Sequence, residues 1–478
     1  MLFSSLSYPI FLWTVFVVWW SLRERRSLRH SLLLAVSYWF YGTMGWWATL
    51  LVAWTTVIDW WVGLHVQRAH DAGDKARARR WMWTSMVSNL AVLAVFKYYD
   101  FFALNVQAAL AHFGVAVSPP LLALALPVGI SFYTFGSMSY VIDVYRGTFR
   151  ATHSLLDFAT FVAFFPHLTA GPIVRARDFL PQMEAPKDPV PQRLAWGLLQ
   201  ILEGLVKKLL IADVLGAQMV DPIFHDSARL ARLDVVSVFV LGLGFLVQVY
   251  GDFAGYTDVA IGSARVLGFD LRPNFNAPLK ADSIFDFWDR WHMSMSQWFR
   301  DYVFAPMVGR QASLLRSCLC TLATLTLVGI WHGAAWTFVL FGLIHGVVMA
   351  LARVFRKLVP MDPWRRSTPW RLCCQVVTIA FVCLTVLLYR ATSVEQWRVA
   401  LRGLSNWNVG GLELPWQVWT VLAVGVVTQL LPEGFVARVR NGWMRSPAVL
   451  QGAVIAVAAV LLFGLRPPGV TPFIYFQF

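Results

Sequence analysis

Apolar stretches of about 20 residues recur from one end of this 478-residue chain to the other, and they constrain its fold more than any other feature. A stretch of that length can cross the hydrocarbon core of a bilayer as one helix. Hydrophobic residues make up 58% of the chain and charged residues 14%, whereas about a quarter of a typical soluble domain is charged. The sequence therefore predicts an all-α polytopic membrane protein.

The membrane-embedded part is expected to be one domain that covers residues 1–478, because no internal repeat or separate soluble region interrupts the pattern. We expect eleven to thirteen membrane segments, some of them re-entrant or tilted. The first, Leu6–Leu22, lacks the basic region and the cleavage site of a signal peptide, so it is expected to stay as a span. A further span is expected over residues 154–170.

The formal net charge of +14 is best explained by topology. Lysine and arginine gather in short loops at 23–29, 68–80, 353–371 and 438–445, whereas the loop 101–120 has none. Basic loops mark the cytoplasmic side of a membrane, so the N-terminus is expected outside the cytoplasm. Membrane lipid is then the expected partner of this basic surface, and no nucleic acid is expected.

The segment 270–310 differs from the rest, because it is too polar to span a bilayer and yet rich in tryptophan and phenylalanine. A helix that starts near Ser283 would gather its apolar residues on one face, with charged residues on the other. Such a helix usually lies in the membrane interface. The expected apolar face, which includes a histidine, consists of Phe285, Trp288, His292, Met295, Phe299 and Tyr302.

Two further histidines, His332 and His345, lie in the apolar stretch "GIWHGAAWTFVLFGLIHG" (329–346). An ionisable group at membrane depth is costly unless it is paired or functional, and burial favours the neutral, proton-accepting imidazole. His332, with Trp331 and Trp336 as apolar walls, is therefore either a general base or a core histidine bonded to a neighbouring helix. His345 is expected to be a packing residue.

Charged residues inside other apolar stretches do not separate an enzyme from a transporter. Glu203 and Lys207 are four residues apart and are expected to pair on one helix face. The stretch "YGDFAGYTDVAIG" adds further carboxylates, and ion pairs that only fix helix packing would explain all of them. The five cysteines lack the spacing of a zinc site, and nucleotide-binding and hydrolase motifs are absent, so neither a metal nor a permanently bound cofactor is expected.

Several stretches together resemble the membrane-bound O-acyltransferase family. They follow one another in the family's order over nearly the whole chain, and the pair "RWHMSMSQWFRDY" and "WHG" is specific. The resemblance is to the bacterial branch of alginate O-acetylation and teichoic-acid D-alanylation. The stretches are "PVGISFYTFGSMSYVIDVYRG" (127–147), "AGPIVRARDF" (170–179), "GLVKKLLIADVL" (204–215), residues 250–304, residues 329–346 and the closing "FIYFQF" (473–478).

The resemblance implies a fold and a site. The fold is a ring of membrane helices, with re-entrant or interfacial helices, around a thin central floor. The histidine of "WHG", here His332, is the family's catalytic residue, and His292 is the second important histidine. Asp289 departs from the family, in which a basic residue is often found, and this can alter docking of the donor or a partner. Further candidates for the substrate path are Trp331, Trp336, Trp291, Ser294, Arg300, Asp301, Tyr256, Asp258 and Asn276.

The expected reaction moves an acyl group, most simply acetyl, from a cytoplasmic thioester to a hydroxyl on the other side of a bacterial inner membrane. The expected donor is acetyl-CoA, or an acyl carrier protein for D-alanyl transfer to teichoic acid. The acceptor is an extracytoplasmic polysaccharide or a periplasmic acetyltransferase partner protein. A polysaccharide or lipid transporter without covalent chemistry is the alternative from another class.

Overall fold

A computed structural model describes residues 1–184, 188–359, 367–410, 412–465 and 473. Every regular element of these residues is helical, as the sequence predicts. The chain divides into two compact units, residues 1–197 with 260–272 and residues 198–259 with 273–478. The prediction that residues 1–478 form one membrane domain stays a prediction.

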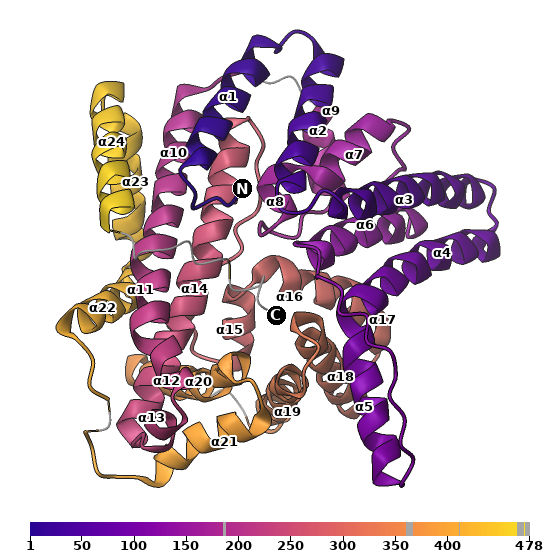
Figure 1. The fold of residues 1–478 in the computed structure, drawn as a ribbon. Helices are drawn as coiled ribbons and strands as arrows, with labels where there is room; N and C mark the ends of the chain where they lie inside the picture. Colours follow the sequence, from indigo (N-terminus) through magenta and orange to yellow (C-terminus); the bar gives the residue numbers. More distant parts are fainter. Residues whose placement is uncertain (185–187, 360–366, 411, 466–472, 474–478) are drawn as a thin grey trace. The chain divides into compact units, whose positions relative to one another are not determined.

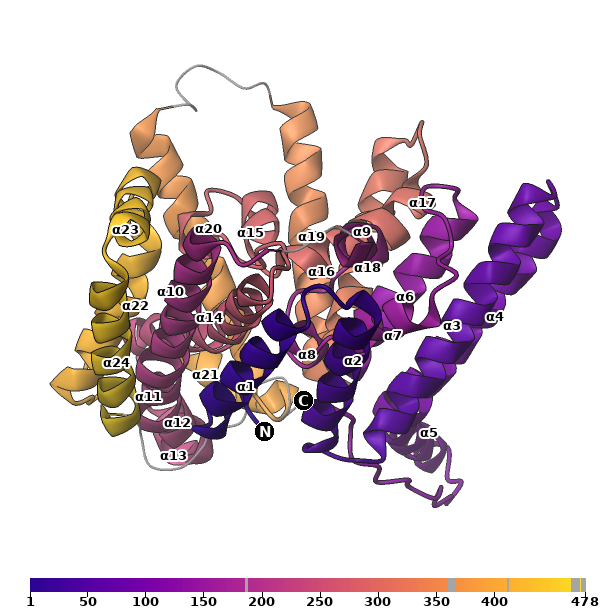
Figure 2. The ribbon, with the colours of Figure 1, turned by 90° about the horizontal axis from the view of Figure 1, so that it is seen from above.

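The first unit holds the N-terminal helices. Within it, α3 (Ala48–Asp71) and α4 (Lys75–Leu93) pack side by side as a long antiparallel pair, and both contact α6 (Ile130–Tyr145) (Figures 1 and 2). Two helices, α10 (Pro191–Val206) and α14 (Val235–Val266), have residues in both units. The remaining helices of this unit are α1 (Ser7–Ser21), α2 (Arg26–Gly42), α3 (Ala48–Asp71), α4 (Lys75–Leu93), α5 (Tyr99–His112), α6 (Ile130–Tyr145), α7 (Leu155–Ala163), α8 (Phe165–Leu168) and α9 (Ala176–Glu184).

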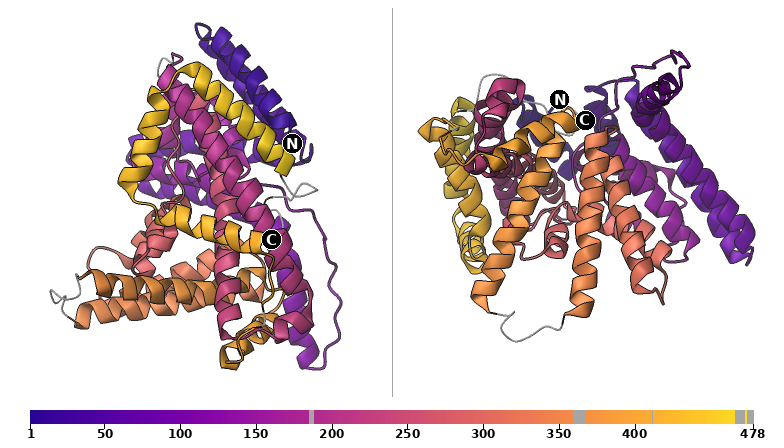
Figure 3. Two further views of the ribbon diagram at one scale, coloured as in Figure 1. Left: turned by 90° about the vertical axis from the view of Figure 1, so that its left-hand side faces the viewer. Right: turned by 90° about the horizontal axis from the view of Figure 1, so that it is seen from below.

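The second unit holds His292, His332 and His345. It contains the antiparallel helices α18 (Leu314–His332), α19 (Trp336–Leu358) and α20 (Thr368–Arg390). Figure 3 shows α19 and α20 close together at one end and farther apart at the other. Its helices are α11 (Asp213–Leu215), α12 (Asp221–His225), α13 (Ser227–Ala231), α15 (Ile284–Arg290), α16 (Met293–Phe299), α17 (Ala305–Val308), α18 (Leu314–His332), α19 (Trp336–Leu358), α20 (Thr368–Arg390), α21 (Val394–Arg402), α22 (Trp416–Leu430), α23 (Glu433–Arg445) and α24 (Ala448–Leu465).

Six helical stretches of the described residues are long and apolar enough to cross a membrane, which agrees with a multi-pass membrane protein. A seventh is added if α22 and α23, which meet at a bend of 94°, form one span. The expected total of eleven to thirteen segments stays a prediction. The span expected over 154–170 is broken at Phe164, and Pro166 follows directly in the first turn of α8, where its missing N–H costs no helical hydrogen bond.

The prediction of a single amphipathic helix from about Ser283 to Tyr302 is wrong. The structure ends α15 at Arg290 and starts α16 at Met293, and His292 between them has a left-handed backbone with φ 43° and ψ 53°. The break occurs because another loop satisfies the start of α16: the N–H of Met293 donates to the carbonyl oxygen of Asn274 at 2.8 Å. His292 is nevertheless fully buried, on the inner side where the periodicity placed it.

Glycines let α18 and α19 approach closely. A Cβ atom at Gly342 would lie 2.3 Å from the carbonyl oxygen of Leu325, and one at Gly329 would lie 2.3 Å from that of Phe338. Small residues at such crossings are typical of membrane helices that pack by van der Waals contact.

Replacing Gly342 with alanine is therefore expected to force the two backbones apart. Overpacking of this kind costs about 1–3 kcal/mol, so the midpoint of thermal unfolding in detergent should fall by several degrees. Gly442→Ala is the matched control, because a Cβ atom there meets nothing within 4 Å. If both variants unfold at the wild-type temperature, the close contact between α18 and α19 is not needed for stability.

Candidate active site

Two histidines from different elements lie close together in the second unit. The ring centroids of His292 and His332 are 6.3 Å apart, and the two residues are 0% and 2% exposed. They are separated by forty positions in the sequence, so the fold brings them together. The arrangement joins the two residues that the sequence singles out as catalytic candidates.

His332 is the last residue of α18. Gly333 after it is extended, and the Phe338 side chain of α19 fills the space over this glycine, where a Cβ atom would meet it at 2.2 Å. The His332 ring also lies 5.1 Å from the ring of Tyr389 on α20 and 4.9 Å from that of Trp331. His332 is therefore placed where the ends of three helices meet.

His292 is held by a hydrogen bond network around Asn274. The Oδ1 atom of Asn274 lies 3.1 Å from His292 Nδ1, 3.2 Å from the backbone nitrogen of Ser294 and 2.8 Å from Ser294 Oγ. The rings of Phe253 and Trp331 close over the imidazole at 4.6 and 5.8 Å. Burial lowers the pKa of His292 from 6.5 to about 3, because the charged imidazolium loses its hydration.

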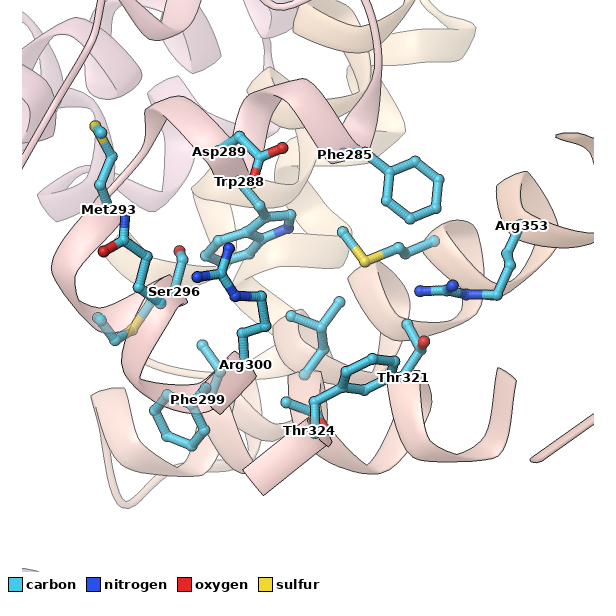
Figure 4. A pocket seen from close by; sticks show the side chains of 16 residues that line it. Phe285, Trp288, Asp289, Met293, Ser296, Phe299, Arg300, Thr321, Thr324 and Arg353 are labelled. Carbon is cyan, nitrogen blue, oxygen red and sulfur yellow. The ribbon is translucent and has the colours of Figure 1, made fainter. Parts of the chain in front are cut away.

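A cavity of about 200 Å³ lies beside α15, α16, α18 and α19. Figure 4 shows Arg300 entering it from one side and Arg353 from the other. The indole N–H of Trp288 and the Nε–H of Arg353 are buried donors with no hydrogen bond partner among the described residues. The remaining wall is mostly apolar. The cavity therefore combines two arginines and two buried hydrogen bond donors with an apolar wall. Asp289 lines the same cavity.

A second and more polar cavity, of about 630 Å³, lies at the other end of α19 and α20. Lys208 in its wall is buried between two carboxylates, at 2.7 Å from Asp213 and 2.6 Å from Asp252. Arg390 in the wall pairs with Asp221 at 2.8 Å. Both cations in its lining are thus paired with carboxylates.

His332 lies between the two cavities along the chain. Val328, one turn before it, lines the first cavity, and Ala334, two residues after it, lines the second. Tyr389, which contacts the His332 ring, also lines the second cavity. The residues that flank His332 along the chain thus belong to the walls of two different cavities.

Some of the other predicted path residues belong to this site. Trp331 contacts both histidine rings, and Ser294 bonds to Asn274. Arg300 lines the first cavity, and its Nε donates to Asp301 at 3.0 Å. Trp331, Ser294 and Arg300 therefore lie at the histidines or the first cavity, and Asp301 pairs with Arg300.

Other predicted residues lie elsewhere. Trp336, expected as an apolar wall beside His332, is 58% exposed and lines neither cavity. Trp291 stacks on Phe287 at 5.5 Å. The side chain of Asn276 is not buried, and its backbone N–H bonds to Arg290.

Tyr256 and Asp258 belong to α14, and their contacts are with Lys208 and Lys207. The ring of Tyr256 lies 5.5 Å from the Lys208 ammonium, whereas Asp258 pairs with Lys207 at 2.5 Å. Glu203, the expected partner of Lys207, still attracts it electrostatically, but Asp258 is the carboxylate within ion-pair distance among the described residues. A neighbouring helix supplies a nearer carboxylate, and the helix changes to π geometry at Lys207, which ends the regular four-residue spacing.

His345 has the surroundings of a packing residue. It is fully buried, its Nε2 lies 2.9 Å from the hydroxyl of Thr385, and the ring of Phe341 covers it at 4.2 Å. This placement fits the packing role that the sequence predicts. The closing residues 474–478 of the "FIYFQF" stretch lie outside the described residues.

Three residues of the site were missed from the sequence: Asn274, Arg353 and Tyr389. Asn274 lies in a loop and carries no periodic signal, and Tyr389 ends an ordinary apolar helix. The signal for Arg353 was present, since it opens the basic loop 353–371, but a loop charge by itself indicates only topology.

The family assignment follows from comparison with known proteins. The model of the membrane-bound O-acyltransferase family matches residues 33–390. The probable alginate O-acetylase AlgI of Pseudomonas aeruginosa is 37% identical to this chain, over 86% of this chain and 77% of the relative. The probable alginate O-acetylase AlgI of Azotobacter vinelandii is 33% identical, over 94% of this chain and 95% of the relative. The peptidoglycan O-acetyltransferase of Helicobacter pylori is 30% identical, over 75% of this chain and 70% of the relative. The chain belongs to the membrane-bound O-acyltransferase family, and it is an O-acyltransferase.

Acid is expected to destabilise the folded protein through His292. Between pH 6.5 and 5 the unfolded chain takes up a proton at this residue and the folded chain does not, because burial lowers the folded-state pKa to about 3. The free energy of unfolding then falls by up to about 1.4 kcal/mol per pH unit. Thermal unfolding in detergent should depend less on pH in His292→Gln than in the wild type.

The exposed His153 provides the control, and His153→Gln should keep the wild-type pH dependence. The same slope in His292→Gln and in the wild type would show that His292 already binds its proton in the folded state.

Proposed function

We propose that the chain transfers an acetyl group from acetyl-CoA on the cytoplasmic side to a hydroxyl on the extracytoplasmic side, as in alginate O-acetylation. The buried pair of His292 and His332, whose neighbours along the chain line two cavities, is the observation that carries this proposal. A transporter would need polar sites along its path, but it would not need a neutral base at their meeting point.

The first cavity is assigned to the thioester donor. Arg353 and Arg300 would hold the phosphates of coenzyme A, since guanidinium groups bind phosphate by charge-assisted hydrogen bonds. The apolar wall would receive the pantetheine arm, with Val328 nearest in sequence to His332. The C-terminal end of α19 leads into the basic loop 353–371, and this supports a cytoplasmic position for the cavity.

The second cavity is assigned to the acceptor. The helices α19 and α20 are each 23 residues long, about 34 Å, which is close to the thickness of the hydrocarbon core. Their ends at Phe338 and Arg390 line this cavity, whereas the opposite ends flank the basic loop. The second cavity would then open toward the extracytoplasmic side.

The chemistry follows from these positions. His332 takes the proton of the acceptor hydroxyl, and the oxygen attacks the thioester carbonyl. A C–O bond forms, the C–S bond breaks, and the imidazolium returns the proton to the leaving thiolate. A positioned base of this kind contributes about 10²–10⁴-fold to the rate. The surrounding rings of Trp331 and Tyr389 limit the access of water that would hydrolyse the donor.

The acetyl group is favoured over D-alanyl because the three relatives described above are named as O-acetylating enzymes. The acceptor is an alginate-like polysaccharide, reached directly or through a periplasmic acetyltransferase partner protein. No cofactor stays bound between turnovers in this scheme. The protein would lie in a bacterial inner membrane with its N-terminus outside the cytoplasm, as the distribution of basic loops indicates.

Replacing His332 with alanine is expected to lower acetyl transfer by about 10²–10⁴-fold, because the acceptor then loses its base. The measurement is the appearance of labelled acetyl groups on external glycan in cells that express the full chain. His153→Ala is the matched control, since that histidine is exposed and far along the sequence from the site. Transfer at the wild-type rate in His332→Ala would contradict the proposal.

Replacing Arg353 with alanine is expected to raise the KM for acetyl-CoA by about tenfold or more with little change in kcat. One charge-assisted hydrogen bond to phosphate contributes about 1.5–3 kcal/mol, and the loss acts on donor binding alone. Release of the coenzyme A thiol by the purified chain reports both constants. Arg438→Ala serves as control, because Arg438 is exposed and bonds only within α23 among the described residues. An unchanged KM in Arg353→Ala would place the donor elsewhere.

A further inference from the structure

We infer that Asn274 is a positioning residue that holds His292 in the tautomer with the proton on Nδ1, so that Nε2 is a hydrogen bond acceptor. This inference rests on the proposed function, since it concerns the second histidine of that site. It begins with the three groups that surround one oxygen atom, Oδ1 of Asn274.

The orientation of the Asn274 amide is determined by the backbone. The N–H of Ser294 lies 3.2 Å from this side chain and can only donate, so the atom that faces it must be the carbonyl oxygen. A flipped amide would place an NH₂ group against that N–H. The hydroxyl of Ser294 donates to the same oxygen at 2.8 Å.

The tautomer of His292 follows from this orientation. Its Nδ1 lies 3.1 Å from the same oxygen, which offers no proton, so Nδ1 must donate. A neutral imidazole has one N–H, and Nε2 at the other edge of the ring then has the lone pair. A second-shell hydrogen bond commonly selects the tautomer of a functional histidine in this way.

The backbone shows why Asn274 can hold the ring in place. His292 has a left-handed backbone that costs free energy for a residue with a side chain, and it does not cap α16 through its own side chain. Asn274 satisfies the first N–H groups of α16 from outside, through its carbonyl oxygen to Met293 and through Oδ1 to Ser294. The same residue therefore fixes both the turn and the ring.

The described contacts of the His292 ring come from α14, the loop before α15, and α18. On α14 the facing side chain is Phe253, on the loop Asn274 and Phe275, and on α18 Trp331 and His332. Among these only His332 titrates. An acceptor of different charge at position 274 should thus change the pH at which His292 gains its proton.

Two substitutions separate tautomer control from a purely structural cap. Asn274→Asp keeps an oxygen for all three donors, and it loses no hydrogen bond, because Nδ2 of Asn274 has no partner among the described residues. Asn274→Leu has a similar shape but no acceptor. The assay is release of the coenzyme A thiol from acetyl-CoA by the full-length chain, with the rate of His332→Ala subtracted.

Asn274→Leu is expected to lower kcat by about 10–100-fold with a smaller change in the KM for acetyl-CoA, as for other second-shell residues. Asn274→Asp should keep most of the activity, because a carboxylate still accepts from Nδ1. Its acid limb should move to higher pH by one to three units, because the nearby negative charge favours the imidazolium. The controls Asn105→Leu and Asn105→Asp make the same changes at a residue that bonds within α5, and they should leave kcat and the pH profile unchanged.

A wild-type kcat in Asn274→Leu overturns the inference. So does an Asn274→Asp chain that is active with the wild-type pH profile, since the residue is then only a helix cap. If Asn274→Leu does not fold, the pH profile of Asn274→Asp decides alone. Failure of the proposed function is distinct, because His332→Ala would then release thiol at the wild-type rate.

Discussion

The turn at His292 is the constraint on which the site depends. It ends one short helix, starts another, and directs a neutral imidazole into a fully buried position beside His332. A left-handed residue with a side chain is unfavourable by itself, so the turn persists because Asn274 satisfies the N–H groups of α16. Without this contact the two helices could join, and the histidine would follow a regular helix instead of meeting its partner.

The second requirement is the close approach of α18 and α19. Glycines at 329 and 342 bring the two backbones together, and α18 stops at His332. The His332 ring then faces aromatic rings from α18 and α20. Residues just before it in the chain line the first cavity, and residues just after it line the second. A base that must serve a donor and an acceptor from opposite sides needs this kind of placement, because neither substrate has to cross the whole protein.

Charges in apolar surroundings have different roles in the two cavities. In the second cavity Lys208 and Arg390 are paired with carboxylates, and the pairing offsets the cost of burying them. In the first cavity Arg353 contacts the rings of Phe285 and Phe304, and no carboxylate of the described residues lies within ion-pair distance. The paired charges are consistent with a structural role in the wall of the second cavity. The arginine without a carboxylate fits a site that binds an anionic group.

The sequence by itself determined the helical membrane class and the family, and it singled out the two histidines as candidates, because hydropathy and short motifs are local properties. It could not determine the break after Arg290, the exposure of Trp336, or the partner of Lys207, since each depends on an element distant in sequence. Asn274 shows the limit most clearly, as its identity is ordinary and only its distance from His292 gives it a role. Tertiary structure decided these features, because a hydrogen bond in a buried site depends on which groups are adjacent in space.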